Sequence, residues 1–117
     1  MKTTNIASLL LGIALGLFAG GLALAQDKTV KVGVLTDNSG LYSDLGGAGS
    51  TLAAQMAIED SGLVAKGWKI DLISADHQNK PDIGTNIGRQ WIDVEKVDIF
   101  MDVLNSGVAL VVNNLVK

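Results

Sequence analysis

The chain has 117 residues, about the length of one small domain, and its 12 acidic and 9 basic residues give a formal net charge of −3. This acidic balance argues against nucleic acid or an anionic membrane as the main partner. The sequence has one histidine and no cysteine, which excludes disulfides, cysteine–zinc sites, a lipid-bearing cysteine and histidine clusters. We therefore expect neither a metal ion nor another cofactor.

The first 25 residues have the pattern of a secretory signal peptide. A start with one lysine precedes Ile6–Ala25, a stretch of 20 residues without charge whose Ala-Leu-Ala ending predicts cleavage between Ala25 and Gln26. A retained transmembrane anchor is the alternative, because such a stretch could span a bilayer. Gly20-Gly21 and the lack of a following basic cluster favour the signal peptide. Its removal leaves a formal charge of −4, and we expect a soluble periplasmic product that is not a lipoprotein.

The first predicted strand, Val30–Leu35, is almost continuously apolar, as expected of a strand that is covered on both faces. A polar loop follows over Asp37–Gly47, where Asp, Asn, Ser and Gly are typical turn residues. A helix is predicted from about Gly49 to Asp60, and Ser61-Gly62 ends it. Its predicted buried stripe has three- and four-residue spacing and consists of Leu52, Ala53, Met56 and Ala57.

The second strand is predicted over Trp68–Ile73, and the polar segment Asp76–Lys80 connects it to a helix that opens at Pro81. Gly84 and Gly88 form a four-apart pair in this helix, for which we expect a close approach of the helix to the sheet. The apolar face of the helix repeats every four residues through Ile83, Ile87 and Trp91.

The third strand is predicted over Val97–Met101, with Leu104–Gly107 as its exit loop, and Ser106 is placed to cap the helix that follows. Strand and helix thus alternate three times with short connections. This order predicts an α/β fold with right-handed crossovers and a three-layer parallel sheet. In a sheet ordered 2-1-3, the loops that leave the first and third strands flank the switch point where a ligand binds.

These two loops hold the candidate ligand-binding residues. Tyr42 lies on one side, and Asn105, Ser106 and Gly107 lie on the other. A helix that begins near Ser106 offers free N–H groups and a positive dipole end, so a small molecule with a carboxylate fits this corner. A plain helix cap at Ser106 and a plain surface aromatic at Tyr42 are the alternatives.

Catalytic chemistry has little support in the sequence. His77, the single histidine, lies in a polar loop, where a solvated side chain is expected. Ser39 and Ser106 lack the G-x-S-x-G elbow of α/β hydrolases. The glycines of Gly46–Gly49 lie well beyond the first strand and match neither the dinucleotide fingerprint nor the phosphate loop. Aspartates at strand ends are expected to bind turn amides, so we expect no enzyme.

Four stretches carry a family resemblance: Val-Gly-Val-Leu-Thr-Asp-Asn-Ser-Gly at 32–40, Ala-Gln-Met-Ala-Ile-Glu-Asp at 54–60, Asn-Lys-Pro-Asp at 79–82 and Asp-Ile-Phe-Met-Asp-Val-Leu-Asn-Ser at 98–106. Through them, residues 30–117 resemble the amino-terminal lobe of ABC-transporter solute-binding proteins of the leucine/isoleucine/valine-binding type. The resemblance implies a periplasmic-binding-protein type I fold, in which residues 26–117 form an incomplete amino-terminal lobe.

The resemblance also implies a hinged, two-lobed receptor that closes on its solute and delivers it to a membrane permease. The ligand-contacting loops of the family correspond here to Ser39–Gly46, with Tyr42, and to Ser106 and its neighbours. Leu41 stands where the family commonly has proline, and many members place the loop aromatic nearer to Leu45. An amino acid, an amide, or an aromatic or aliphatic acid could each be the solute. Because the rest of the receptor lies outside these 117 residues, we expect this chain alone to bind weakly or not at all.

Two other functions are compatible with the same residues. A ligand-sensing module of a receptor or regulator is the first, because this fold is reused for sensing. An α/β enzyme is the second, and turnover that Ser106→Ala and Asp44→Asn abolish would support it.

Overall fold

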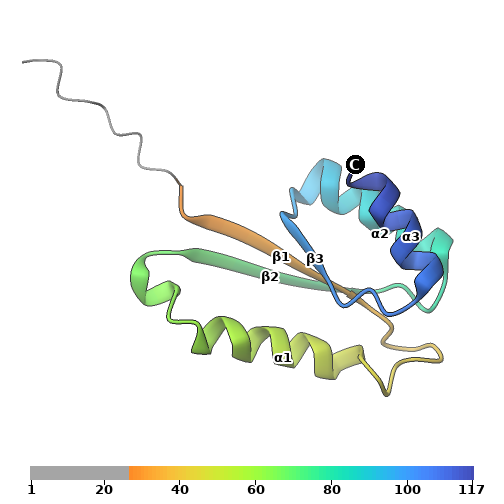
Figure 1. Cartoon of the computed structure of the whole chain (residues 1–117), viewed down its shortest axis with the longest axis horizontal. Coiled ribbons are helices and arrows are strands. Elements are labelled where there is room, and N and C mark those ends of the chain that lie inside the picture. Colours follow the sequence, from red (N-terminus) through yellow and green to blue (C-terminus); the bar gives the residue numbers. More distant parts are fainter. Residues whose placement is uncertain (1–26) are drawn as a thin grey trace, which may run out of the picture.

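The computed structural model describes residues 27–117, so the predicted signal peptide and its cleavage point lie outside the described part. It shows an α/β fold with a three-stranded parallel sheet (Figure 1). The elements in chain order are β1 (Thr29–Thr36), α1 (Gly47–Asp60), the 3-10 turn η2 (Val64–Lys66), β2 (Lys69–Asp76), α2 (Pro81–Gln90), the π-helical turn η3 (Trp91–Glu95), β3 (Ile99–Met101) and α3 (Ser106–Leu115).

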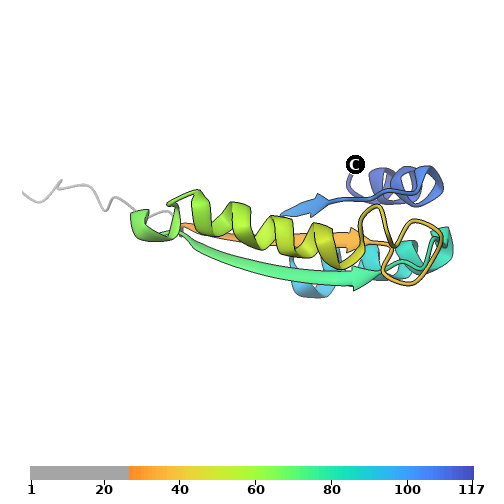
Figure 2. The ribbon, with the colours of Figure 1, turned by 90° about the horizontal axis from the view of Figure 1, so that it is seen from below.

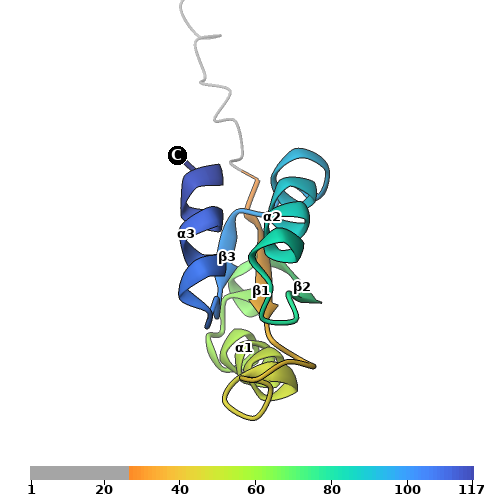
Figure 3. The same cartoon turned by 90° about the vertical axis from the view of Figure 1, so that its right-hand side faces the viewer.

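The strand order β2-β1-β3 confirms the predicted arrangement, with β1 in the centre and both neighbours parallel to it. The crossover β1–α1–β2 and the crossover β2–α2–β3 run across the sheet in opposite directions, so right-handed connections place α1 and α2 on opposite faces. α1 covers one face along the length of β1 and β2 (Figure 2). α2 and α3 lie on the other face, as the end-on view shows (Figure 3). β2 is longer than predicted, and Asp76 is its last residue rather than part of the connection.

The core on the α2–α3 face is built around Trp91, which is 5% exposed. Its indole ring lies directly on β1, because a methyl group placed on Gly33 would be 2.3 Å from the ring carbon Cζ3. The ring also packs against Phe100 of β3, with a distance of 5.4 Å between the ring centroids. Leu35, Val108 and Val112 complete this buried cluster.

Gly84 and Gly88 do allow a close approach, but the partner is α3 and not the sheet. A methyl group on Gly84 would lie 2.5 Å from Cγ1 of Val108, and one on Gly88 would lie 3.0 Å from Cδ1 of Leu115. The expectation of a helix–sheet contact was therefore wrong. Helix periodicity predicts which residues share a face, but it does not say whether that face meets a strand or another helix.

The predicted buried stripe of α1 is also wrong. Leu52 is 57% exposed and Met56 is 54% exposed, while Ala54 and Ile58 turn toward the sheet. Apolar residues occur on several sides of this helix, so their spacing does not identify a single inward face. α1 consequently covers the sheet only in part.

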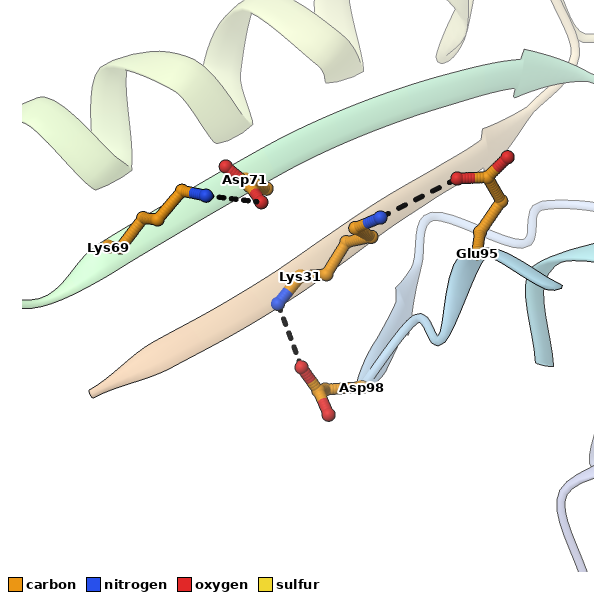
Figure 4. Close-up of polar contacts among 5 residues, drawn as sticks. All are labelled: Lys31, Lys69, Asp71, Glu95 and Asp98. Atoms are coloured by element: carbon orange, nitrogen blue, oxygen red, sulfur yellow. Dashed lines mark hydrogen bonds and ion pairs between the residues drawn. The ribbon is translucent and has the colours of Figure 1, made fainter. Parts of the chain in front are cut away.

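Polar contacts lie along the sheet far from the carboxyl ends of the strands, and those of Lys31 join β1 to the segment before β3 (Figure 4). The backbone N–H of Lys31 donates to Oδ2 of Asp98 at 2.8 Å, and the backbone N–H of Asp98 donates to the Lys31 carbonyl at 2.9 Å. Lys31 Nζ also pairs with Glu95 at 3.5 Å, and Lys69 pairs with Asp71 at 3.6 Å. Both ion pairs are partly exposed, so we expect each to contribute only about 0–1 kcal/mol.

The contact between Trp91 and Gly33 gives a direct test of the core. Gly33→Ala should lower the free energy of unfolding by about 3 kcal/mol, because the new methyl group overlaps a ring that packed neighbours hold in place. Urea unfolding followed by circular dichroism measures this change. Gly49→Ala is the matched control, since a methyl group there meets nothing within 4 Å and should leave the stability unchanged or slightly higher. Equal stability of the two variants would contradict this account of the core.

Candidate functional site

Three loops meet at the edge of the sheet where the parallel strands end. They are the β1–α1 loop, the β2–α2 loop and the β3–α3 loop, and we call this edge the carboxyl rim. β1 and β3 are neighbours, as predicted, so the loops with Tyr42 and Ser106 leave adjacent strands at this rim. A methyl group on Gly46 would lie 2.5 Å from Leu104 and 2.9 Å from both Asp102 and Thr36. The β1–α1 loop therefore packs closely on the β3–α3 loop.

Asp37 shapes the loop that carries Tyr42. Its carboxylate is fully buried and accepts the backbone N–H of Gly40 at 2.6 Å and that of Tyr42 at 2.9 Å. Both carboxylate oxygens are thus occupied by turn amides, as predicted for a strand-end aspartate. The Tyr42 side chain is half-buried, and its carbonyl accepts the backbone N–H of Gly46. The buried carboxylate of Asp37, five residues earlier in the chain, therefore helps to set the position of Tyr42.

Ser39 binds across the rim to the end of β2. Its hydroxyl donates to Oδ2 of Asp76 at 2.6 Å, while Oδ1 accepts the backbone N–H groups of Asn38 at 2.9 Å and Gln78 at 2.8 Å. Partial burial disfavours the charged carboxylate, but the hydrogen bonds from the Ser39 hydroxyl and from the two backbone N–H groups outweigh it and lower the pKa of Asp76. The Ser39 oxygen can still accept a hydrogen bond from a solute.

The amino terminus of α3 is capped by Asn105 and not by Ser106, which corrects the predicted cap. Oδ1 of Asn105 accepts the backbone N–H of Val108 at 2.9 Å, and Ser106 is the first residue of the helix. Asn105 has the extended backbone of a cap residue, and its side chain reaches the third helical N–H. Ser106 is exposed. The first-turn N–H groups at Ser106 and Gly107 have no intrahelical acceptor and stay available to an anion.

His77 is buried, which overturns the expectation of a solvated loop histidine. Its side chain is fully buried, and its backbone N–H donates to the Thr36 carbonyl at 2.9 Å, which extends the pairing of β1 and β2 by one residue. Nδ1 accepts the backbone N–H of Asn79 at 3.0 Å. The polar neighbours of His77 in the sequence predicted an exposed side chain. The pairing of β1 and β2 continues past Asp76, however, and His77 is buried as part of it.

The three loops are linked in pairs around the rim. Ser39 joins the first loop to Asp76, and Gly46 joins it to Leu104. Asn79 joins the second loop to the third through a short hydrogen bond with Asn105. Three of the predicted residues form the amino terminus of α3, namely Asn105, Ser106 and Gly107. Ser39 instead binds Asp76 at the end of β2. Sequence reasoning missed Asn79 as part of this site.

Other features of residues 27–117 offer less to a charged solute. An apolar groove of about 380 Å³ lies between α1 and the sheet, with Val30, Ile70 and Ile99 among its lining residues. It lies near the start of β1, at the far end of that strand from Asp37, and its lining is almost entirely apolar. The described residues contain no group of three or more acidic or histidine side chains placed to hold a metal ion. None of their helices is long and apolar enough to cross a membrane.

The cap at α3 leads to a stability test. Asn105→Ala should lower the free energy of unfolding by about 1–2 kcal/mol, because the Val108 N–H loses its acceptor. Ser106→Ala should change it by less than about 0.5 kcal/mol, as for an exposed first-turn residue. Chemical unfolding of the two variants measures the difference, and a larger effect at Ser106 would restore the original cap prediction.

Asp76 leads to a test with pH. Because its pKa is lower in the folded state, its contribution to stability is present above the ordinary aspartate pKa and is lost as the pH falls through the lowered value. Urea unfolding of the wild type should therefore show a loss of stability over this acidic range. Ser39→Ala should make that loss smaller, since it removes a hydrogen bond that favours the carboxylate. Ser43→Ala, in the same loop, is the control and should keep the wild-type dependence.

Comparison with known proteins finds one matching family and several similar solved structures. A model of a periplasmic binding protein family matches residues 29–117. A periplasmic binding protein from Burkholderia mallei is 41% identical, with a TM-score of 0.69, over 75% of this chain and 24% of that one. A branched chain amino acid ABC transporter periplasmic ligand-binding protein from Burkholderia xenovorans is 52% identical, with a TM-score of 0.69, over 74% of this chain and 23% of that one.

A third solved structure is an ABC-transporter solute-binding protein from R. palustris in complex with benzoate. It is 25% identical, with a TM-score of 0.63, over 76% of this chain and 24% of that one. The search of curated proteins finds no match. The matched part of this chain thus spans about a quarter of the length of these solved structures.

Proposed function

Because the chain belongs to the periplasmic binding protein family through residues 29–117, we propose that it is the amino-terminal part of the solute-binding component of an ABC uptake transporter. In this proposal the protein is exported to the periplasm and binds an amino acid or a related small carboxylate or amide. It then delivers this solute to a permease in the membrane. Proteins of this family bind solutes and do not transform them, so we assign no catalytic residue.

The carboxyl rim carries the proposal. The start of α3 combines free N–H groups with the positive end of the helix dipole, which favours an anionic group. The Ser106 hydroxyl is exposed beside these N–H groups, and Tyr42 supplies an aromatic surface from the loop of the adjacent strand. Asn105, Ser106 and Gly107 would then bind a carboxylate, and Tyr42 and Ser39 would contact the remainder of the solute.

The solutes named for two similar proteins share one chemical group. The protein from B. xenovorans belongs to a branched chain amino acid transporter, and the protein from R. palustris was solved with benzoate. Branched-chain amino acids and benzoate differ in shape, but each carries a carboxylate. A rim that binds the carboxylate through backbone N–H groups fits both classes, and the surrounding side chains would set the preference between them.

The described residues form only one side of such a site. Tyr42 is half-buried and Ser106 is exposed, so a solute at the rim would stay open to water on its other side. Tight binding of a small solute requires that most of its surface be buried. We therefore propose that this chain by itself binds its solute weakly, and that a second surface encloses the solute in the whole receptor.

Titration of the full chain tests both parts of the proposal. Calorimetry with leucine, isoleucine, valine and benzoate should give dissociation constants weaker than about 100 µM, since binding in the micromolar range requires about −8 kcal/mol. Nuclear magnetic resonance at millimolar solute should show shifts concentrated at the amides of Tyr42, Ser106 and Gly107. Benzamide is the matched control for benzoate, because it lacks the charge that α3 attracts. Submicromolar binding would overturn the weak-binding proposal, and shifts confined to the apolar groove would overturn the site.

A further inference from the structure

Two hydrogen bonds connect His77 and Asn79 of the β2–α2 loop to Asn105 at the start of α3. We propose that Asn79 is a positioning residue: held by His77, it fixes the orientation of the Asn105 amide and thereby the amino terminus of α3. The geometric part of this inference concerns the folded chain alone. Its consequence for solute binding rests on the function proposed above.

The His77 side chain holds the backbone of Asn79 through one hydrogen bond. Because Nδ1 accepts the Asn79 N–H, the neutral imidazole carries its proton on Nε2. Nε2 is buried and has no hydrogen-bond partner within residues 27–117. A buried polar group without a partner disfavours folding. Within residues 27–117, Nδ1 is thus the only nitrogen of this ring that makes a hydrogen bond, and this bond holds the Asn79 backbone.

Asn79 in turn selects one of the two orientations of the Asn105 amide. The cap requires that Oδ1 of Asn105 face the Val108 N–H, so Nδ2 must point away from the helix. Nδ2 of Asn105 donates to Oδ1 of Asn79. If the Asn105 amide turned over, its NH₂ group would face the Val108 N–H and its oxygen would face the Asn79 oxygen. Both contacts would then be repulsive. The Oδ1 acceptor of Asn79 therefore keeps the Asn105 amide in the orientation in which it caps α3.

The backbone of the β2–α2 loop has an uncommon conformation at Asn79, the residue that supplies this Oδ1 acceptor. Gln78 and Asn79 both have left-handed backbone angles, with φ values of 53° and 57°. Such conformations are uncommon for residues other than glycine, and they gather where surrounding contacts determine the backbone. Pro81, two residues later, packs against α3, because a methyl group on Gly107 would lie 3.0 Å from its Cγ. The start of α3 is therefore contacted by the Asn79 side-chain amide of the β2–α2 loop and by Pro81, the first residue of α2.

Hydrogen exchange of the full chain tests the geometric part without any ligand. Asn79→Gly removes the side-chain acceptor and keeps a residue that tolerates positive φ. It should speed exchange of the Val108 amide by roughly three- to tenfold, the range expected for a weakened helix cap. Gln78→Gly is the matched control, because it makes the same change one residue earlier at the same kind of φ, and it should leave Val108 unchanged. Equal acceleration in both variants would overturn the inference, since it would show general loosening of the loop.

Asn79→Asp should restore slow exchange at Val108, because aspartate tolerates the same φ and keeps an acceptor for Nδ2 of Asn105. Failure of this rescue would also overturn the inference. The wild-type chain provides a measurement that needs no variant. One of the two Asn105 side-chain NH₂ protons should exchange more slowly than the other, and two equivalent fast protons would contradict the bond to Asn79.

The same variants separate this inference from the proposed function. If α3 binds a carboxylate, Asn79→Asp should weaken the benzoate-induced shifts at Ser106 and Gly107 even though it restores the cap, because it adds a negative charge beside the solute. Benzoate shifts that are unaffected by the new charge would contradict the carboxylate site. The exchange results at Val108 would still decide whether Asn79 positions the helix.

Discussion

The contact of the Trp91 indole with the backbone of β1 at Gly33 determines where the helices on one face of the sheet can lie. The ring occupies the space that a side chain on the central strand would take, which draws the end of α2 onto the sheet. α3 then packs against α2 at the distance that Gly84 permits, with Val108 buried between them. Since Val108 is also the residue whose N–H binds the cap, the core of this face and the start of α3 share one residue. The position of the candidate site is therefore set by the core and not by the loops alone.

The carboxyl rim is held by a different kind of interaction. Buried or partly buried polar groups, namely Asp37, Asp76, His77, Asn79 and Asn105, bind backbone N–H groups or one another. Hydrogen bonds of this kind depend strongly on direction, whereas apolar packing depends mainly on area. A rim built in this way holds its N–H groups in fixed positions, as the proposed solute site requires. Such preorganisation lowers the cost of ordering the site on binding.

The other face of the sheet is only partly covered by α1. About half of the surface of each of four apolar side chains is exposed here, namely Leu52 and Met56 on α1 and Ile99 and Met101 on the edge strand β3. The apolar groove lies between α1 and the sheet. Exposed apolar surface of this extent is typical of a surface that another element covers. The chain spans about a quarter of the length of the solved structures that it resembles.

The sequence by itself determined the alternation of strands and helices, the parallel character of the sheet, the loops at its edge and the family resemblance. These features depend on apolar periodicity and on turn residues, which are local properties of the chain. Only the tertiary structure decided that Asn105 caps α3, that His77 is buried, that Gly84 meets a helix and that Asn79 belongs to the rim. Each of these depends on a partner distant in the chain or on a hydrogen bond chosen among several polar neighbours. The local sequence pattern shows which polar groups and small residues are available for contacts. The packing of separate helices, strands and loops decides which of them contact each other.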